Sequence, residues 1–219
     1  MSVDGPAGQP FRTIMDVARG ILEPAGGVDA FRASSLRSLV ADAASLEAMI
    51  RRGNPLVYSV ATSRVPRGAG EIGFAVTSIE PGRVGSEFFM TRGHVHQRPE
   101  GEVYVRLSGA GGVVLRRGSV TRWVELSDSC VLSIPPGWAH RAVNVAAEPF
   151  RFLAVYPADL VNDYRAVEAA GMGARIVAAR VGYRVVAADG LDLAGPSGSR
   201  TRPAGFVEFH APPRRRNRP

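Results

Sequence analysis

The sequence predicts an all-β protein, built as an antiparallel sandwich or barrel, with helices confined to the two ends of the chain. From Asn54 to about Pro157, apolar and polar residues alternate with a period of two. Gly, Pro and Ser turns interrupt these β-branched and aromatic runs every eight to twelve residues or so, the spacing of short strands in an all-β domain. A parallel sheet would need a helix between successive strands, and the stretches between the runs are too short for one.

Residues 1–53 are expected to form a helical or irregular N-terminal extension. Between Ser34 and Gly53, apolar residues recur three and four positions apart, which is typical of an amphipathic helix. Ser34 or Ser35 can cap the start of this helix, and Gly53 can end it in a left-handed conformation.

Residues 54–188 are expected to form the barrel domain, followed within it by a short helix and a hairpin. The predicted strands are residues 71–79, 86–96, 102–109, 111–117, 121–126, 130–135, 139–145 and 150–157. The helix should end near Gly171, and the hairpin should occupy residues 175–190. Residues 189–219 are dominated by Gly, Pro, Ser and Arg and are predicted to be a disordered tail, apart from docking of Phe206, Val207 and Phe209.

Composition excludes several classes of protein. The chain of 219 residues has no apolar stretch near the ~20 residues of a membrane span and no visible secretory signal, so a cytoplasmic protein is expected. Its one cysteine, Cys130, cannot form an internal disulfide. Residues 200–219 contain six arginines against Glu208, and so carry +5 of the net charge of +7. Binding to nucleic acid would depend on this tail alone and is not expected.

Three of the four histidines lie in the β region, in an arrangement suited to a metal ion. His94 and His96 are two apart on a predicted strand and therefore point to one face. Glu102 opens the next strand, and a tight turn can return its carboxylate to the pair; His140 comes from a distant segment. Three imidazoles and one carboxylate suit Fe(II), Mn(II), Ni(II) or Zn(II).

These residues lie in two motifs that occur in a fixed order. The first is G-H-x-H-x5-E-x6-G from residue 93, and the second is P-x-G-x2-H-x3-N from residue 135. The pair resembles the two motifs of the cupin barrel. This resemblance implies a cupin fold (a double-stranded β-helix or jelly roll), carrying here an N-terminal helical extension and a short C-terminal helix.

A narrower resemblance covers residues 77–164. The stretches TRGHVH, EVYVRLSGAGGVVL, PPGWAHRAVNVAAEPFRFLAVYPAD and NDY are similar to those of the cupin-type phosphoglucose isomerases, the archaeal type of glucose-6-phosphate isomerase. The resemblance implies a metal-dependent aldose–ketose isomerase that interconverts glucose 6-phosphate and fructose 6-phosphate in glycolysis and gluconeogenesis. It also implies a homodimer.

The resemblance assigns roles residue by residue. One divalent ion, with Fe(II) the first choice, would be held by His94, His96, Glu102 and His140. The substrate phosphate would be received by Thr77, Thr91, the backbone at Gly93, and Tyr156. Tyr104 would hydrogen-bond a sugar hydroxyl, and Glu102 would be the base of a proton-transfer route; a hydride shift remains the alternative.

Three positions depart from the family pattern. Phe88 and Ser129 stand where the two motifs normally begin with glycine, and Asn162 stands where family members carry histidine. Two other functions remain open. An Fe(II) dioxygenase of the cupin class would consume oxygen and ignore phosphate, and a noncatalytic sugar or metal sensor would bind nucleic acid through its arginine-rich tail.

Overall fold

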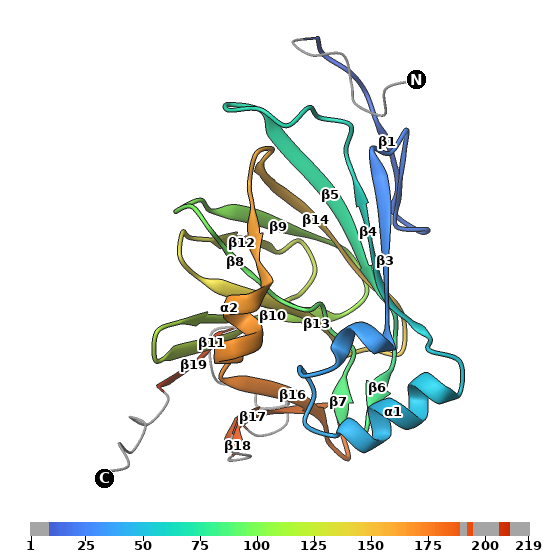
Figure 1. The fold of residues 1–219 in the computed structure, drawn as a ribbon, viewed down its shortest axis with the longest axis vertical. Coiled ribbons are helices and arrows are strands. Elements are labelled where there is room, and N and C mark those ends of the chain that lie inside the picture. The colour runs from blue at the N-terminus through green and yellow to red at the C-terminus, as the bar shows by residue number, and fades with distance from the viewer. Residues whose placement is uncertain (1–8, 189–191, 195–205, 211–219) are drawn as a thin grey trace.

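Two antiparallel sheets pack across a shared core in the computed structural model, which describes residues 9–188, 192–194 and 206–210 (Figure 1). The larger sheet has the order β12-β9-β14-β5-β4-β3. Its strands are β3 (Gly27–Arg32), β4 (Leu56–Thr62), β5 (Ile72–Ile79), β9 (Glu102–Ser108), β12 (Val131–Ile134) and β14 (Phe150–Pro157). The second sheet has the order β13-β10-β11-β19. Its strands are β10 (Gly111–Arg117), β11 (Val120–Leu126), β13 (Ala139–Asn144) and β19 (Phe206–His210).

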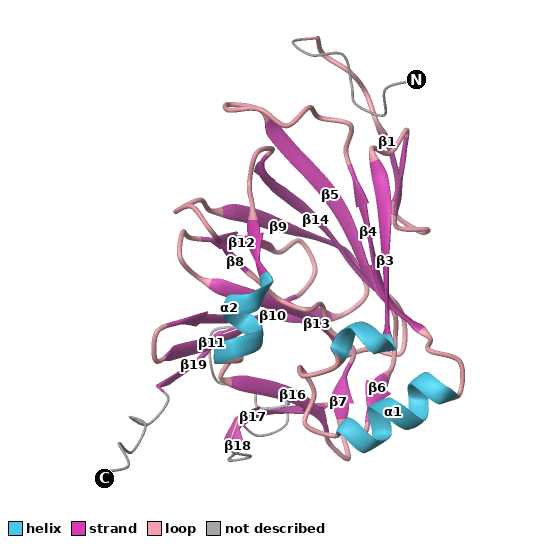
Figure 2. Ribbon diagram, in the orientation of Figure 1, coloured by secondary structure: helices cyan, strands magenta, loops and turns pink. Residues whose placement is uncertain are grey.

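Smaller sheets and three helical segments complete the fold, and Figure 2 shows the helices at the periphery of the strands. The remaining strands are β1 (Ile14–Asp16), β2 (Ile21–Glu23), β6 (Arg83–Val84), β7 (Glu87–Phe88), β8 (Val95–His96), β15 (Asn162–Asp163), β16 (Ala174–Ala178), β17 (Tyr183–Ala187) and β18 (Asp192–Ala194). The helices are a 3-10 turn η1 (Ala33–Leu36), α1 (Ala43–Arg51) and α2 (Tyr164–Ala170). None of the described helices has the length and apolar character needed to cross a bilayer.

The alternation that predicted strands also places the core. On β14, Phe150 and Phe152 are buried in the core between the sheets. Leu153 follows them on the opposite face of the strand and is only partly buried. Inward residues of β10 such as Val113 join the same core. Burying each such side chain stabilises the fold by about 1.5–3 kcal/mol. The all-β fold of packed antiparallel sheets expected from the sequence is confirmed.

Most predicted strands occur within a residue or two of their expected bounds, and one breaks up. The stretch 86–96 was expected to be continuous but forms β7, isolated bridges at Met90 and His94, and then β8. Gly93, at a φ of 76°, turns the chain within this stretch, since extended strand backbone requires a negative φ. The structure also adds β4, which the list of predicted strands leaves out.

The N-terminal helix is shorter than the apolar pattern predicts. It begins after Asp42, whose side chain accepts a hydrogen bond from the Ser45 amide, because a carboxylate caps a helix start well. Ser34 is therefore not the cap; its amide donates to the Asn54 side chain. Gly53 follows the helix with a φ of 143°.

Part of the predicted extension is β structure rather than helix. Strands β1 and β2 form a hairpin, and β3 pairs with β4 along its length, so that the larger sheet begins before residue 54. The division of the chain into three zones remains a prediction.

The C-terminal expectations are largely met. Helix α2 ends before Gly171, as predicted, at a φ of 68° that glycine adopts at low cost, and β16 pairs with β17 as the predicted hairpin. The backbone of β19 pairs with β11, which agrees with docking of this segment. The rest of the predicted disordered tail lies outside the described residues.

Candidate metal centre and adjoining cavity

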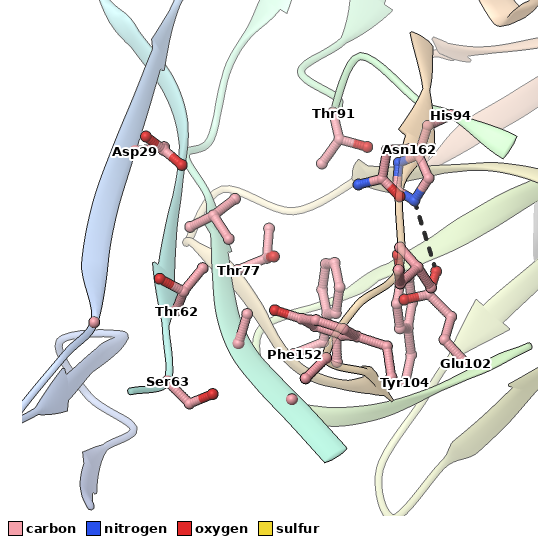
Figure 3. Close-up of a pocket in the computed structure, with 18 of the residues that line it drawn as sticks. Asp29, Thr62, Ser63, Thr77, Thr91, His94, Glu102, Tyr104, Phe152 and Asn162 are labelled. Carbon is pink, nitrogen blue, oxygen red and sulfur yellow. Dashed lines mark ion pairs between the residues drawn. The ribbon is translucent and has the colours of Figure 1, made fainter. Parts of the chain in front are cut away.

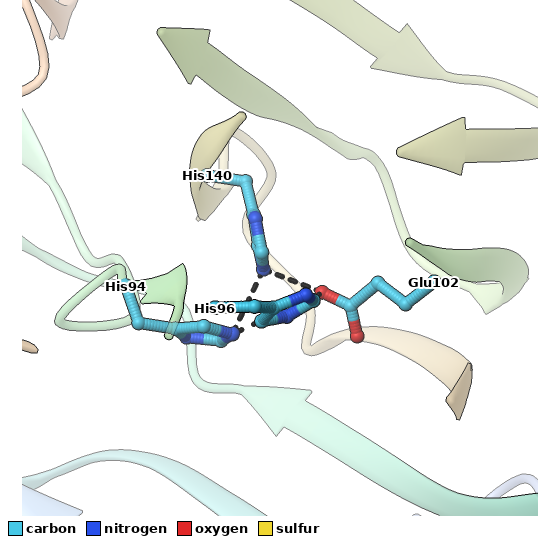
Figure 4. Close-up of side chains that lie close together, drawn as sticks. All are labelled: His94, His96, Glu102 and His140. Atoms are coloured by element: carbon cyan, nitrogen blue, oxygen red, sulfur yellow. Dashed lines mark hydrogen bonds and ion pairs between the residues drawn. The ribbon is translucent and has the colours of Figure 1, made fainter. Parts of the chain in front are cut away.

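Two segments far apart in the sequence meet at the centre of the site. The His94 amide donates to the His140 carbonyl oxygen at 3.1 Å, and the His140 amide donates to the His94 carbonyl oxygen at 2.9 Å. His140 lies on β13, and His96 lies two residues beyond His94 on β8. This short bridge places the imidazoles of both motifs in one volume (Figure 4).

The four predicted ligands converge. The Nε2 atoms of His140 and His94 are 2.9 Å apart. The Oε1 atom of Glu102 lies 2.5 Å from Nε2 of His140, 3.5 Å from that of His96 and 3.9 Å from that of His94. One ligand atom from each residue lies within 4.8 Å of all the others. The structure thus brings together all four predicted ligands.

Hydrogen bonds behind the rings leave the inward nitrogens free to bind a metal. Nδ1 of His96 donates to the Glu100 carbonyl oxygen at 2.7 Å, and Nδ1 of His140 donates to the Trp138 carbonyl oxygen at 3.0 Å, since a carbonyl can only accept. Each ring therefore turns an Nε2 lone pair toward the centre. Nε2 of His96 and Oε1 of Glu102 are buried without a hydrogen-bond partner. Acceptor atoms that converge in this way fit a divalent cation.

Burial and charge set the protonation of the cluster. Burial, and then the charge of His140, hold the pKa of His94 well below its usual range, which favours the neutral, metal-binding ring. Burial alone would lower the pKa of His96, but the nearby Glu102 carboxylate and the Glu100 carbonyl oxygen raise it overall. Burial would raise the pKa of Glu102, yet His140 and the other two rings hold it well below its usual range. Glu102 is therefore ionised at neutral pH.

The cluster opens into a cavity of about 380 Å³ on the inner face of the larger sheet. Figure 3 shows His94, Glu102 and Asn162 at one side of this cavity, and Asp29, Thr62 and Ser63 at the other. Small residues on β5 leave room for the cavity. Across the sheet, Gly73 is paired with Tyr156 and Ala75 with Ala154, both on β14. A Cβ at Gly73 would lie 2.9 Å from the Tyr156 ring, so the glycine is needed for the ring to lie there.

The residues predicted to bind phosphate or to act in catalysis share this cavity. Its wall contains Thr77, Thr91, Gly93, Tyr156, Glu102 and Tyr104, while His96 and His140 do not line it. The Thr91 hydroxyl oxygen accepts a hydrogen bond from the Ala142 amide at 3.1 Å, which leaves its proton for a ligand. Burial, followed by the charge of Glu102, raises the pKa of Tyr104 well above its usual value, so this phenol remains a donor.

Sequence reasoning missed several residues of the wall. Tyr58 is buried, and its hydroxyl oxygen accepts a hydrogen bond from the Arg92 amide at 3.5 Å. The alternation of residues along β4 is the sequence signal that could have predicted this position. Tyr164 faces the cavity beside the Arg92 guanidinium, which lies 4.6 Å from the ring centroid. Asp29 lies on the edge strand β3, and nothing in its local sequence marked it as part of a site.

Two of the departures from the family pattern lie outside the cavity wall. Phe88 belongs to β7, and Ser129 occupies a turn at a φ of 59°, a conformation that glycine adopts at lower cost. Asn162 does line the cavity. Its backbone pairs with His96, its side-chain nitrogen donates to the Tyr164 hydroxyl at 3.4 Å, and its side-chain oxygen is buried without a partner.

A family model described as glucose-6-phosphate isomerase (GPI) matches residues 31–188, most of the chain. The chain belongs to the glucose-6-phosphate isomerase family. The family match begins in β3 and ends just after β17, so it contains both motifs and the whole cavity apart from Gly26 and Asp29.

Archaeal members of the glucose-6-phosphate isomerase family are similar along most of their length. The glucose-6-phosphate isomerase of Thermococcus litoralis is 37% identical over 171 residues, 77% of this chain and 90% of that protein. The enzyme of the same name from Pyrococcus abyssi is 36% identical over the same shares. Among solved structures, oxalate decarboxylase from Bacillus subtilis is 20% identical over 48% of this chain and 27% of that chain, with a TM-score of 0.38, a likeness too slight to bear on function.

Proposed function

We propose that this chain interconverts glucose 6-phosphate and fructose 6-phosphate with the help of one divalent metal ion. Iron(II) is the first choice of metal, and manganese, nickel and zinc are the alternatives, because the His3Glu donor set accepts each of them. The observation that carries the proposal is the convergence of His94, His96, Glu102 and His140 at the end of a polar cavity, in a member of this family.

The residues around the cluster have separate roles in the proposed reaction. When bound, a divalent ion supplies positive charge beside the oxygens on C1 and C2 of the sugar. The buried Tyr104 hydroxyl donates a hydrogen bond to a sugar hydroxyl and orients the reacting carbons. At the other end of the sugar, the phosphate accepts hydrogen bonds from the hydroxyls of Thr77, Thr91 and Tyr156 and from the Gly93 amide. Binding energy from the phosphate then positions C1 and C2.

Glu102 is the base in a proton-transfer route. Its pKa is held well below the usual range, so it is ionised but weakly basic. It therefore needs to move away from His140 before it can take a proton from C2 or C1. Deuterium uptake from heavy water at the transferred hydrogen supports this route, whereas complete retention of that hydrogen indicates a hydride shift.

A coupled isomerase assay tests the function. Chelator-stripped protein is resupplied separately with Fe(II), Mn(II), Ni(II) and Zn(II), and formation of fructose 6-phosphate is followed. Activity that depends on the metal and requires a phosphorylated sugar is expected. Oxygen consumption without isomerisation would instead assign the chain to the cupin dioxygenases.

We also propose that the chain forms a homodimer through the outer face of the larger sheet. A row of aliphatic residues crosses all six strands on that face, each paired with the next: Val131, Val105, Leu153, Val76, Ala61 and Val28. Val131 and Val28, at the two ends of the row, are 64% and 62% exposed, whereas Val76 and Ala61 in its middle are buried against Leu22 of β2. The water-facing side of an antiparallel sheet is normally polar, so the exposed aliphatic residues on either side of the part that Leu22 covers favour a second copy of the chain as their cover.

Sedimentation analysis of variants that introduce a charge tests the dimer. Leu153→Glu should give a monomer, and Val181→Glu, at an exposed valine in another part of the fold, should leave the dimer intact. A monomeric wild-type protein would contradict the proposal.

We also propose that the protein is cytoplasmic. Its single cysteine, Cys130, is free, which suits the reducing cytosol.

A further inference from the structure

Arg141 is a buried cation beside the proposed phosphate site. It follows His140 on β13, so its side chain leaves the strand on the opposite face from the metal ligands. Its exposure is 5%. Both Nε and a terminal nitrogen of its guanidinium donate to one acceptor, the carbonyl oxygen of Arg92, at 3.2 and 2.8 Å.

The choice of partner is unusual for a buried charge. A buried guanidinium normally pairs with a carboxylate, since removing a charge from water is costly. Within the described residues Arg141 forms no ion pair, and Glu87, the acid that acts on it through space, is bound instead by Arg175 at 3.2 Å. Burial lowers the pKa of Arg141 to about 10, which leaves it charged at neutral pH. Its charge therefore acts mainly on one peptide group.

That peptide group carries the Gly93 amide. In a trans peptide the C=O and N–H bonds point in opposite directions. Arg141 holds the oxygen of the Arg92–Gly93 peptide from outside the cavity, and Gly93 itself lines the cavity. Among the described residues no acceptor is recorded for the Gly93 amide, whereas the neighbouring amides of Thr91 and His94 bond to β13.

We propose that Arg141 is a positioning residue for substrate phosphate: by holding the Arg92 carbonyl oxygen it aims the Gly93 N–H into the cavity and polarises it as a donor. A charge on the carbonyl side strengthens the N–H of the same peptide, as in any chain of hydrogen bonds. The positive charge also lies behind the site at which a dianion would bind. This inference rests on the proposed function, because it concerns the phosphate end of the same cavity.

The packing around Gly93 supports the same role. A Cβ built on Gly93 would lie 3.1 Å from Cβ and 3.2 Å from Nε of Arg141, and 3.1 Å from the His140 carbonyl oxygen. The residue also has a φ of 76°. Glycine is thus required here by close contact with Arg141 and by backbone conformation, in addition to the open approach to phosphate expected from the sequence.

Kinetics and phosphate binding of Arg141→Met and Arg141→Lys test the proposal. Arg106→Met is the matched control, because Arg106 also donates from Nε to a carbonyl oxygen, that of Gly109, but Gly109, unlike Gly93, does not line the cavity. For each protein we would measure KM and kcat for glucose 6-phosphate, the inhibition constant of inorganic phosphate, and the bound metal.

We expect Arg141→Met to raise KM and the phosphate inhibition constant together by about tenfold or more, the usual effect of losing a hydrogen bond to a charged group. The change in kcat should be much smaller, and the metal content unchanged. Arg141→Lys, which keeps the charge and one donor, should recover part of the phosphate affinity and also covers the case in which the methionine variant fails to fold. Arg106→Met should match the wild type.

Two results would overturn the role of Arg141. One is an unchanged phosphate inhibition constant in a folded Arg141 variant. The other is a loss of kcat and metal without a change in KM, which would mark a purely structural residue. Failure of the proposed function is distinguishable, because the wild-type protein itself would then show no isomerisation of glucose 6-phosphate.

Discussion

The main chains of His94 and His140 hydrogen-bond to each other in both directions, and the Nε2 atoms of the two rings lie 2.9 Å apart. The residues are 46 positions apart in the sequence. The bridge between them stands outside the named strands, at the point where the segment before β8 passes β13. The candidate metal centre thus depends on this local main-chain contact between the two motifs.

Replacement of His140 by alanine should abolish metal retention and activity together. His140 is 1% exposed and lies closest to both Glu102 and His94, so its loss removes a ligand and leaves two acceptors facing a void. Metal analysis of the purified variant and the isomerase assay measure the two effects. The control is Trp138→Phe, which keeps the backbone carbonyl that orients His140. Full metal content in His140→Ala would contradict the assignment.

Glu102→Gln should affect turnover of the sugar more than binding of the metal. An amide oxygen can still approach the ion but carries no charge and is not a base, so we expect partial metal retention and a loss of kcat of at least about 100-fold, the lower range for a general base. Metal titration by calorimetry and steady-state kinetics are the measurements. If the variant turned over at the wild-type rate, Glu102 would not be the base.

Thr91→Val should raise KM for glucose 6-phosphate about tenfold or more, because a hydrogen bond to a charged group contributes about 1.5–3 kcal/mol. Valine also leaves the Ala142 amide without its acceptor. Thr91→Ser keeps the hydroxyl and is the matched control, with KM close to that of the wild type. Equal KM values for all three proteins would remove Thr91 from the phosphate site. The same comparison applies to Tyr156→Phe.

Glu125 predicts a pH dependence of stability. Burial raises its pKa above the usual value, and it accepts a hydrogen bond from the Tyr183 hydroxyl. Between the ordinary pKa of about 4.3 and the raised one, the folded state binds more protons than the unfolded chain, so stability falls as the pH rises through this window. Glu125→Gln does not titrate there.

Urea unfolding of the wild type and Glu125→Gln at pH 4 and pH 7 measures this effect. The variant should gain stability relative to the wild type at pH 7 and lose that advantage at pH 4. A stability difference that is the same at both values would contradict a raised pKa for Glu125.

The strands were predictable because each depends on an alternation that is local in sequence. Strands β5, β10 and β14 begin and end within a residue of their predicted bounds. The N-terminal helix was less predictable. Its apolar pattern continues back to Leu36, yet Asp42 caps the first turn, and Ser38 at a φ of 66° separates that turn from η1. The Asp42 cap and the turn at Ser38 decided a boundary that periodicity could not.

The sequence by itself predicted the four residues of the candidate metal centre, and the structure brings them together. Two histidines two apart, a glutamate after a turn and a histidine in a second motif specify a donor set, because residue type and strand period are both local properties. Only the tertiary structure added the remaining side chains of the cavity wall and the contacts behind it. Tyr58, Asp29 and Tyr164 come from separate elements, and the Arg141 guanidinium reaches the Arg92 carbonyl from the next segment. Such contacts arise from the packing of one sheet against another, and no spacing along the chain encodes them.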